Sequence, residues 1–322
     1  MAKRLVALAL GLAVGVLLFE GALRLLLAVS TRPEPPEMRP IPGAPPIVSS
    51  WPADPPSRQG SRPTKILVVG DSFTLGRGVA LDQVYPARLA KTLRSAGHDV
   101  KVTSYSFPGW NSRAEAAALK RDLDKYAPDL LIVGHCLNDA EKVPTARATS
   151  NRPELRPWQP EGPLESSLAR HSILFGRVRR AVDSIRLRPL LRDYYQELYR
   201  DNRGRRLWQS SLAALSALAA ERSIPAALVV FPIFDSDPDD AYPYRNLHEL
   251  VEDTGTDLGF AVLDLLPVYS GIDGRELALV PFTDPHPSVR GHDLAGQAIA
   301  HFLVERGLLG SGEPLEPTGP DS

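Results

Sequence analysis

The sequence has little cysteine and almost no excess of charge of either sign. Cys136 is the only cysteine among the 322 residues, which excludes an intrachain disulfide. Lys and Arg together number 37 against 38 Asp and Glu, so the formal net charge is −1. Binding to nucleic acid requires a basic surface that displaces counterions from phosphates. This balance of charges offers no such surface, and we expect no nucleic-acid partner.

The sequence does contain enough apolar material for a packed core. Hydrophobic residues make up 43% of the chain and charged residues 23%, a composition typical of globular proteins. A length of 322 residues accommodates one α/β domain of ordinary size together with appendages. The 31 prolines are clustered, which indicates linkers outside the core.

A nearly unbroken apolar run opens the chain, at residues 5–29. As a helix it is long enough to cross the roughly 30 Å hydrocarbon layer of a membrane. Glu20 and Arg24 interrupt the run, and each charge costs roughly 2.5–3.5 kcal/mol at the bilayer centre. They stand four positions apart and can therefore pair on one face of a helix. The run still predicts a spanning helix.

The flanks of this run suggest its orientation. Lys3 and Arg4 precede it, which favours a cytoplasmic N-terminus. We expect residues 1–30 to form a single-pass anchor in a bacterial inner membrane, with the rest of the chain in the periplasm. A cleaved signal peptide is the alternative, but no clean small-x-small site follows the run. Residues 31–63 are rich in proline and predict a linker, and residues 310–322 predict a disordered tail.

Strand and helix patterns alternate between residues 64 and 309, which we interpret as one domain. Short β-branched or apolar runs predict strands at residues 65–71, 99–107, 129–135, 225–234 and 260–266. Helical spacing of apolar residues occurs at residues 84–96, 113–126, 207–222, 247–259 and 289–306. An Arg-rich, irregularly helical insertion is expected at about residues 150–206. Such alternation predicts an α/β fold with a parallel sheet, whose ligand sites lie beyond the carboxyl ends of the strands.

A serine follows the first predicted strand of the domain, in the run Gly70-Asp71-Ser72-Phe73. A serine at a strand end next to glycine projects from a tight turn, which is a good position for a nucleophile. Its hydroxyl group is a weak nucleophile until a base removes the proton. Taken alone, this run also fits an ordinary turn in which Ser72 caps a helix.

A candidate base stands near the other end of the chain, in the run Asp284-Pro285-His286-Pro287. The two prolines predict a loop here, which they stiffen, and they restrict the direction of the His286 ring. Asp284 can turn back to the imidazole, fix its tautomer and stabilise the imidazolium that forms during catalysis. We therefore expect Asp284, His286 and Ser72 to be catalytic residues.

Acyl transfer also needs hydrogen-bond donors for the developing oxyanion. Asn138 follows the third predicted strand and Gly109 follows the second, so both stand at the same sheet edge as Ser72. A glycine can present its backbone N–H without obstruction by a side chain. We expect the oxyanion hole to consist of the N–H groups of Ser72 and Gly109 and the side-chain amide of Asn138.

Taken together, Gly70-Asp71-Ser72, Gly109, Asn138 and Asp284 with His286 resemble the four conserved blocks of the SGNH (GDSL) hydrolases. The resemblance implies a flavodoxin-like three-layer α/β/α sandwich with a central parallel sheet. It implies that serine is the nucleophile, that histidine is the base, and that no cofactor or metal takes part.

The resemblance extends over residues 65–309, with two departures. Asp284 and His286 are spaced D-x-H, whereas the common last block of the family is D-x-x-H. The shorter spacing is similar to that of periplasmic acetyltransferases that modify exopolysaccharides, although it also occurs in plain esterases. The glycine block lacks the usual preceding asparagine but keeps the donor, Gly109.

The sequence thus predicts a membrane-anchored serine esterase or deacetylase acting on an acyl ester, with an acylated glycan or lipid as the candidate substrate. An O-acetyltransferase acting on an envelope polysaccharide would use the same acyl-enzyme and remains an alternative. A catalytically inactive glycan-binding module, and a flavodoxin-like phosphate or nucleotide binder, belong to different functional classes. The last of these leaves His286 unexplained.

Overall fold

The computed structural model describes residues 4, 11, 14–25, 45–52, 62–143, 152–155, 158–281 and 284–309. The chain divides into a smaller unit, residues 1–34 and 156–189, and a larger unit, residues 35–155 and 190–322. Much of the predicted anchor and linker, and the whole predicted tail, lie outside the described residues. In the part of the chain that the structure describes, no helix combines the length and the apolar character needed to cross a membrane.

The larger unit is built on a six-stranded, mostly parallel sheet, which confirms the parallel sheet predicted from the sequence. The strand order is β1-β3-β2-β4-β5-β6, and β1 alone pairs antiparallel, with β3. Numbered along the chain, the five parallel strands follow the order 2-1-3-4-5, as in flavodoxin-like sheets. The strands are β1 (Ile47–Trp51), β2 (Thr64–Gly70), β3 (Val100–Ser106), β4 (Leu130–His135), β5 (Ala226–Val230) and β6 (Ala261–Asp264).

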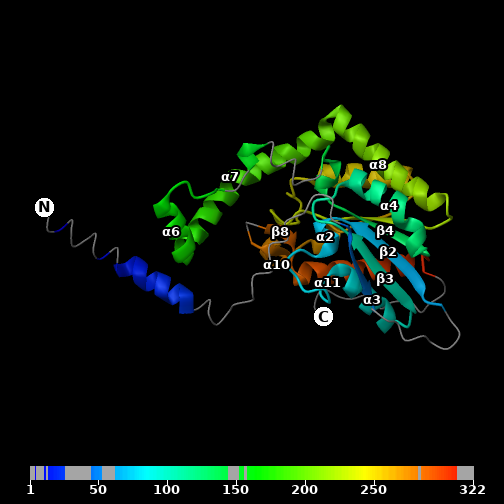
Figure 1. The fold of residues 1–322 in the computed structure, drawn as a ribbon, viewed down its shortest axis with the longest axis horizontal. Coiled ribbons are helices and arrows are strands. Elements are labelled where there is room, and N and C mark those ends of the chain that lie inside the picture. The colour runs from blue at the N-terminus through cyan, green and yellow to red at the C-terminus, as the bar shows by residue number, and fades with distance from the viewer. Residues whose placement is uncertain are drawn as a thin grey trace. The chain divides into compact units, whose positions relative to one another are not determined.

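Alternate residues of the central strands face two separate hydrophobic cores. Ile66 and Val68 of β2 belong to the core shared with helices α3 (Tyr85–Ser95) and α11 (Val289–Glu305). Leu67 and Val69 belong to the core shared with α4 (Ser112–Tyr126), α8 (Asn202–Ala220) and α9 (Arg245–Asp257). Figure 1 shows the sheet of the larger unit between these helices, with α4 and α8 on one face and α3 and α11 on the other. Burial of both faces is why β2 is apolar almost throughout.

Strand β1 corrects the linker prediction for residues 31–63. Its five residues pair along β3 from Ile47 opposite Ser106 to Trp51 opposite Val102. The run IVSSW contains no proline, so every residue can take part in the ladder. The linker interpretation was wrong here because proline-rich neighbours hid a short proline-free segment. In the other direction, β5 ends at Val230, earlier than predicted, just before Pro232.

The segment around His286 is a strand rather than the loop expected from its prolines. Helix α10 (Gly274–Leu277) leads into β7 (Ala278–Val280), which pairs antiparallel with β8 (Asp284–Pro287) in a separate two-stranded sheet. Ser288 then caps α11 by accepting a hydrogen bond from the Gly291 N–H at 3.2 Å. His286 therefore lies within a paired strand that leads directly into the buried helix α11.

The predicted insertion contains regular helices. They are α6 (Pro163–His171) and α7 (Ile173–Arg200), and Pro189 lies inside α7. Residues 163–189 belong to the smaller unit, together with a helix at residues 14–25, while α7 continues into the larger unit from Leu190.

Candidate active site

Ser72 lies directly beyond the carboxyl end of β2, at the start of the one-turn helix α2 (Ser72–Leu75). Asp71 caps this helix, because its Oδ1 atom accepts a hydrogen bond from the Phe73 N–H at 2.8 Å. Gly70 leaves no room for a side chain, since a Cβ atom there would lie 2.0 Å from Thr74 Oγ1. The tight turn presents Ser72 at the sheet edge, where the residue is 8% exposed.

The structure brings His286 against Ser72. The Oγ atom of Ser72 and the Nε2 atom of His286 are 2.9 Å apart, a hydrogen-bond distance. On the other side of the ring, His286 Nδ1 is hydrogen-bonded to Asp284 Oδ1. The same oxygen accepts the His286 backbone N–H at 3.1 Å. Phe73 packs on the imidazole with ring centroids 5.0 Å apart.

The pairing with His286 keeps Asp284 ionised. Burial alone raises the pKa of this carboxyl group, because burial disfavours the charged form. The hydrogen bond and the charge of His286, with a smaller contribution from Arg77, outweigh burial and leave the pKa of Asp284 below its ordinary value. Asp284 is therefore a carboxylate at neutral pH that can orient the imidazole and compensate its positive charge. The two-residue spacing permits this because a single Asp284 oxygen serves both the ring and the backbone of His286.

Asn138 is joined to the turn that contains Ser72 through Asp71. It lies in the 3₁₀ turn η1 (Leu137–Ala140), which follows β4. Its Nδ2 atom donates to Asp71 Oδ2 at 2.9 Å, and the Ser72 hydroxyl approaches the same oxygen at 3.4 Å. Asp71 therefore bridges the amide of Asn138 and the serine. Asp71 belongs to the Gly70-Asp71-Ser72 motif, but the motif alone does not indicate this bridging role.

Gly109 lies in the turn that leaves β3. Because β2 and β3 are paired with Gly70 opposite Ser106, the chain segments that follow the two strands begin side by side. The Phe107 N–H donates to the Gly70 carbonyl at 3.3 Å, which extends this pairing beyond the strands. Gly109 has φ +72°, a conformation that favours glycine.

A group of buried acids lies behind the site. Glu115 is 0% exposed, and among the described residues neither of its carboxyl oxygens has a hydrogen-bond partner. Burial, together with the charges of Asp139 and Asp71, raises the pKa of Glu115 well above its ordinary value. Burial and the charge of Asp71 likewise raise the pKa of Asp139, against the opposing hydrogen bond from the Cys136 N–H. Each of these two carboxyl groups therefore keeps its proton to a higher pH than an ordinary carboxyl group does.

Cys136 is a packing residue beside this group and is not a second nucleophile. The residue is 2% exposed, and its thiol approaches Asp71 Oδ2 at 3.4 Å and also contacts Asn138 Oδ1. Burial and the charges of Asp71 and Asp139 raise the pKa of the thiol well above its ordinary value. A protonated thiol is unreactive.

Two further histidines are buried and neutral. His135 Nε2 accepts the Trp208 indole N–H at 3.0 Å, and His292 Nδ1 accepts the Tyr85 N–H at 3.2 Å. Burial is the main cause that lowers the pKa of each to about 3, so neither serves as a base near neutral pH. Within the described ranges, no group of three or more His, Cys, Asp or Glu side chains could hold a metal ion.

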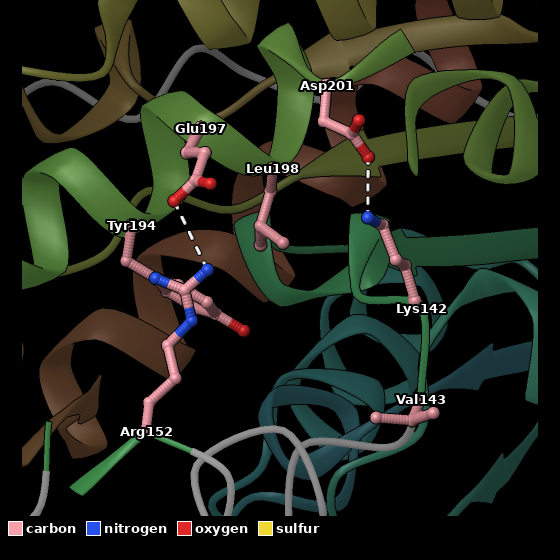
Figure 2. Close-up of a pocket in the computed structure, with 7 residues that line it drawn as sticks. All are labelled: Lys142, Val143, Arg152, Tyr194, Glu197, Leu198 and Asp201. Atoms are coloured by element: carbon pink, nitrogen blue, oxygen red, sulfur yellow. Dashed lines mark hydrogen bonds and ion pairs between the residues drawn. The ribbon is translucent and has the colours of Figure 1, made fainter. Parts of the chain in front are cut away.

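A pocket of about 190 Å³ opens in the larger unit at the end of η1 (Figure 2). Two ion pairs cross its wall: Lys142 with Asp201 at 2.7 Å, and Arg152 with Glu197 at 3.2 Å. The Arg152 guanidinium lies over the Tyr194 ring, 5.1 Å from its centroid. The residues that line this pocket include none of the predicted catalytic residues. Because both cations already have acidic partners, we assign the pocket no ligand.

A serine paired with a histidine that is itself paired with an aspartate, at the carboxyl edge of a parallel sheet, defines the serine-hydrolase type of site. The model of the GDSL-like lipase/acylhydrolase family matches residues 68–294. The chain belongs to this family, which confirms the family expected from its motifs.

Individual proteins resemble this chain over a short segment or at low sequence identity. An arylesterase of Vibrio mimicus is 33% identical over 88 residues, which are 27% of this chain and 44% of the arylesterase. The match thus spans less than half the length of that relative. A variant of an acetylxylan esterase from Geobacillus stearothermophilus has a TM-score of 0.46 at 16% identity, covering 76% of this chain and 94% of the other. A lipase/acylhydrolase from Enterococcus faecalis has a TM-score of 0.45 at 16% identity, covering 79% and 99%.

Proposed function

We propose that the protein is a serine esterase or deacetylase that hydrolyses an acyl ester through an acyl-enzyme. The observation that supports this most strongly is the 2.9 Å distance between Ser72 Oγ and His286 Nε2. In the proposed first step, Ser72 Oγ attacks the ester carbonyl while His286 Nε2 takes the hydroxyl proton. Asp284 holds the ring through Nδ1 and stabilises the imidazolium.

The tetrahedral intermediate places a negative charge on the former carbonyl oxygen. We assign its stabilisation to the N–H groups of Ser72 and Gly109 and to the amide of Asn138. The hydrogen bond from Asn138 to Asp71 supports this assignment, because it directs the nitrogen side of the amide towards the serine turn. A donor that is already oriented needs no rearrangement when the charge develops.

Collapse of the intermediate expels the alcohol, which receives the proton from His286, and leaves the acyl group on Ser72. Water then attacks the acyl-enzyme with His286 again acting as base, and the acid is released. Each step uses side chains and backbone groups of this chain, and the proposal includes no cofactor.

The substrate proposed is an acyl ester, with acetyl as the candidate acyl group and an acylated glycan or lipid as the candidate molecule. Transfer of the acyl group to a polysaccharide hydroxyl is the second candidate. The D-x-H spacing of Asp284 and His286 favours it, since the sequence resembles acetyltransferases in this block. Water and a sugar hydroxyl would compete for the same acyl-enzyme.

We also propose that residues 1–30 anchor the chain in a bacterial inner membrane, with the catalytic domain in the periplasm. The apolar run at residues 5–29 and the preceding Lys3 and Arg4 support this. Separation of membranes from soluble cell fractions, followed by protease treatment of intact spheroplasts, tests the location and its orientation.

Labelling with a fluorophosphonate probe tests the catalytic proposal directly. The folded full-length chain should form an adduct on Ser72, detected by mass spectrometry of its peptides. Heat-unfolded protein and the Ser72→Ala variant should form none, whereas Ser210→Ala, an exposed serine on α8, should label normally. Absence of an adduct in folded protein would support a non-catalytic glycan-binding module instead. Acetate release measured with and without an oligosaccharide acceptor then separates hydrolysis from transfer.

A further inference from the structure

The two charges in the N-terminal apolar run have a structural partner in the smaller unit. The Glu20 carboxylate accepts the backbone N–H of Ile173 at 2.8 Å and that of Leu174 at 2.9 Å, and the Ser172 hydroxyl donates to it at 3.0 Å. The first N–H groups of a helix have no acceptor within the helix. Glu20 therefore caps α7 from a segment about 150 positions away in the sequence.

Arg24 completes the junction. Its Nε atom donates to Glu20 at 3.1 Å, and its guanidinium also contacts the carbonyl of His171, the last residue of α6. The helix at residues 14–25 thus contacts the point at which α6 ends and α7 begins. This explains why an acidic and a basic residue interrupt an otherwise apolar run.

Beyond this junction, α7 exposes an apolar stripe. Val178, Val182 and Ile185 follow one another at spacings of four and three, which puts them on one helix face. They are 51%, 48% and 73% exposed, whereas Ser184 on another face is 7% exposed. Helix α6 shows the same feature, with Leu164 72% exposed and Leu168 38% exposed at a spacing of four. A helix in a water-soluble unit normally buries such a stripe.

Arginines border the stripe of α7 on both sides. At 3.6 residues per turn, Arg179 and Arg186 lie along one edge and Arg177 and Arg188 along the other. Arg177 and Arg186 are exposed, and Arg186 also pairs with Asp183 at 3.2 Å. Arg179 is half-buried and lies over the Trp158 ring, 4.2 Å from its centroid. Over residues 158–189 the sequence has six arginines and three acidic residues. Apolar side chains between rows of arginines are typical of helices that lie in the interface of an anionic bilayer.

We propose that α6 and the first half of α7, residues 163–189, lie on the surface of a bilayer that contains anionic lipid. The apolar stripe enters the boundary with the acyl chains, the exposed Arg177 and Arg186 meet the phosphates, and Glu20 joins this surface to the N-terminal helix. The inference rests on the proposed membrane anchor, because that anchor brings the junction at Glu20 to the membrane. It is independent of the esterase chemistry.

The depth of residue 182 in a membrane tests the proposal. The full-length Val182→Cys chain is labelled with an environment-sensitive fluorophore and reconstituted in vesicles of phosphatidylcholine mixed with phosphatidylglycerol. Lys120→Cys, on the exposed face of α4, provides the matched label in the larger unit. The native Cys136 is 2% exposed, and the labelled parent chain gives the background. Lipids with spin labels on their acyl chains serve as quenchers.

We expect strong quenching at position 182, little at position 120, and weaker quenching at position 182 in vesicles of phosphatidylcholine alone. Equal quenching at the two positions would overturn the proposal. A blue-shifted label at position 182 that is not quenched, but responds to protein concentration, would also overturn it, because a second copy of the chain would then cover the stripe.

A second variant tests the role of Glu20. Glu20→Ala should lower the quenching at position 182, because α7 loses its link to the N-terminal helix, while Glu252→Gln on the exposed face of α9 should not. Unchanged quenching in Glu20→Ala would overturn this role.

Flotation of the chain with the vesicles separates the proposed membrane anchor from the proposed interfacial helices. A chain that does not float contradicts the anchor, and a chain that floats with an unquenched label contradicts the interfacial helices alone.

Discussion

Ser72 Oγ and His286 Nε2 lie 2.9 Å apart although 214 positions separate the two residues. The contact depends on two different parts of the larger unit. Ser72 follows the central strand β2, and His286 lies in the β7–β8 hairpin just before α11 packs against α3. The pairing of Ser72 with His286 is therefore a product of the completed fold and cannot form in either segment alone.

Removal of either member of this pair should abolish most of the activity. Ser72→Ala and His286→Ala should each lower kcat for p-nitrophenyl acetate by roughly 10³-fold or more, because the hydroxyl and its base act as one unit. For the same reason, the double variant should be no slower than the slower single variant. Steady-state kinetics, with circular dichroism to check folding, measures this. Multiplicative losses in the double variant would show that the two side chains act independently.

Much of the fold follows from local patterns in the sequence. The apolar run of β2 and the helical spacing of α3, α4, α9 and α11 locate these elements to within a few residues, because both faces of the sheet are buried. By contrast, β1 carries little local signal. As an edge strand it pairs with one neighbour, and the four residues from Ile47 to Ser50 could equally be an extended linker.

The site could be predicted in part for a related reason. Ser72, Gly109 and Asn138 follow successive strands, and parallel strands bring their carboxyl ends to one edge. The hairpin at His286 was not predictable, because prolines on both sides of the histidine indicate a loop. The acids behind the site, Glu115 above all, were missed because a glutamate in the first turn of a helix ordinarily faces solvent.

Asp284 should affect the rate more than the stability. In Asp284→Asn the side chain keeps its size, but the amide no longer compensates the imidazolium and no longer selects the tautomer of His286. We expect kcat to fall by roughly 10²- to 10⁴-fold, with little change in KM or melting temperature. Since the pKa of Asp284 lies below its ordinary value, this carboxylate should not cause an acidic fall in rate near neutral pH. A variant with nearly full activity would contradict the assigned role.

Asn138 should act in the transition state, and Asp71 should act through it. Asn138→Ala should lower kcat by roughly 10²- to 10³-fold without a matching change in KM, the usual effect of removing an oxyanion donor. Asp71→Asn keeps an oxygen for the cap of Phe73 but replaces the acceptor that faces Asn138 Nδ2. It should therefore lower kcat by a smaller factor. If the melting temperature of each variant falls along with its kcat, so that the loss of rate follows the loss of folded protein, the role of both residues is purely structural.

The turn behind the nucleophile should not tolerate a methyl group. A Cβ atom on residue 70 would lie 2.0 Å from Thr74 Oγ1 and 2.8 Å from Thr74 Cβ, and Thr74 is itself held by a 2.8 Å hydrogen bond to the Tyr85 hydroxyl. Relief of this clash has to move the turn that contains Ser72. We expect Gly70→Ala to lower the free energy of unfolding by roughly 1–3 kcal/mol and to lower kcat. Chemical denaturation and kinetics of the same preparation measure both effects, and an unchanged kcat would contradict the expected movement of Ser72.

The buried Glu115 should make the protein less stable as the pH rises. Its pKa in the folded chain lies well above the ordinary value of 4.5, because burial and the charges of Asp139 and Asp71 disfavour the carboxylate. Below pH 4.5 Glu115 is protonated in both the folded and the unfolded state. Its titration therefore does not lower the free energy of unfolding in this range. Between pH 4.5 and the raised pKa, only the unfolded chain releases it, and the unfolding equilibrium should shift by about tenfold per pH unit towards the unfolded state.

Glu115→Gln keeps the shape of the protonated side chain and removes this titration. The variant should therefore match the natural chain near pH 4.5 and become more stable than the natural chain as the pH rises from 4.5 towards the raised pKa of Glu115. Denaturant midpoints measured for both chains across this range provide the test. A difference between the two chains that does not grow with pH would contradict the inference that Glu115 keeps its proton in the folded state, since only a group protonated in one state and ionised in the other links folding to pH.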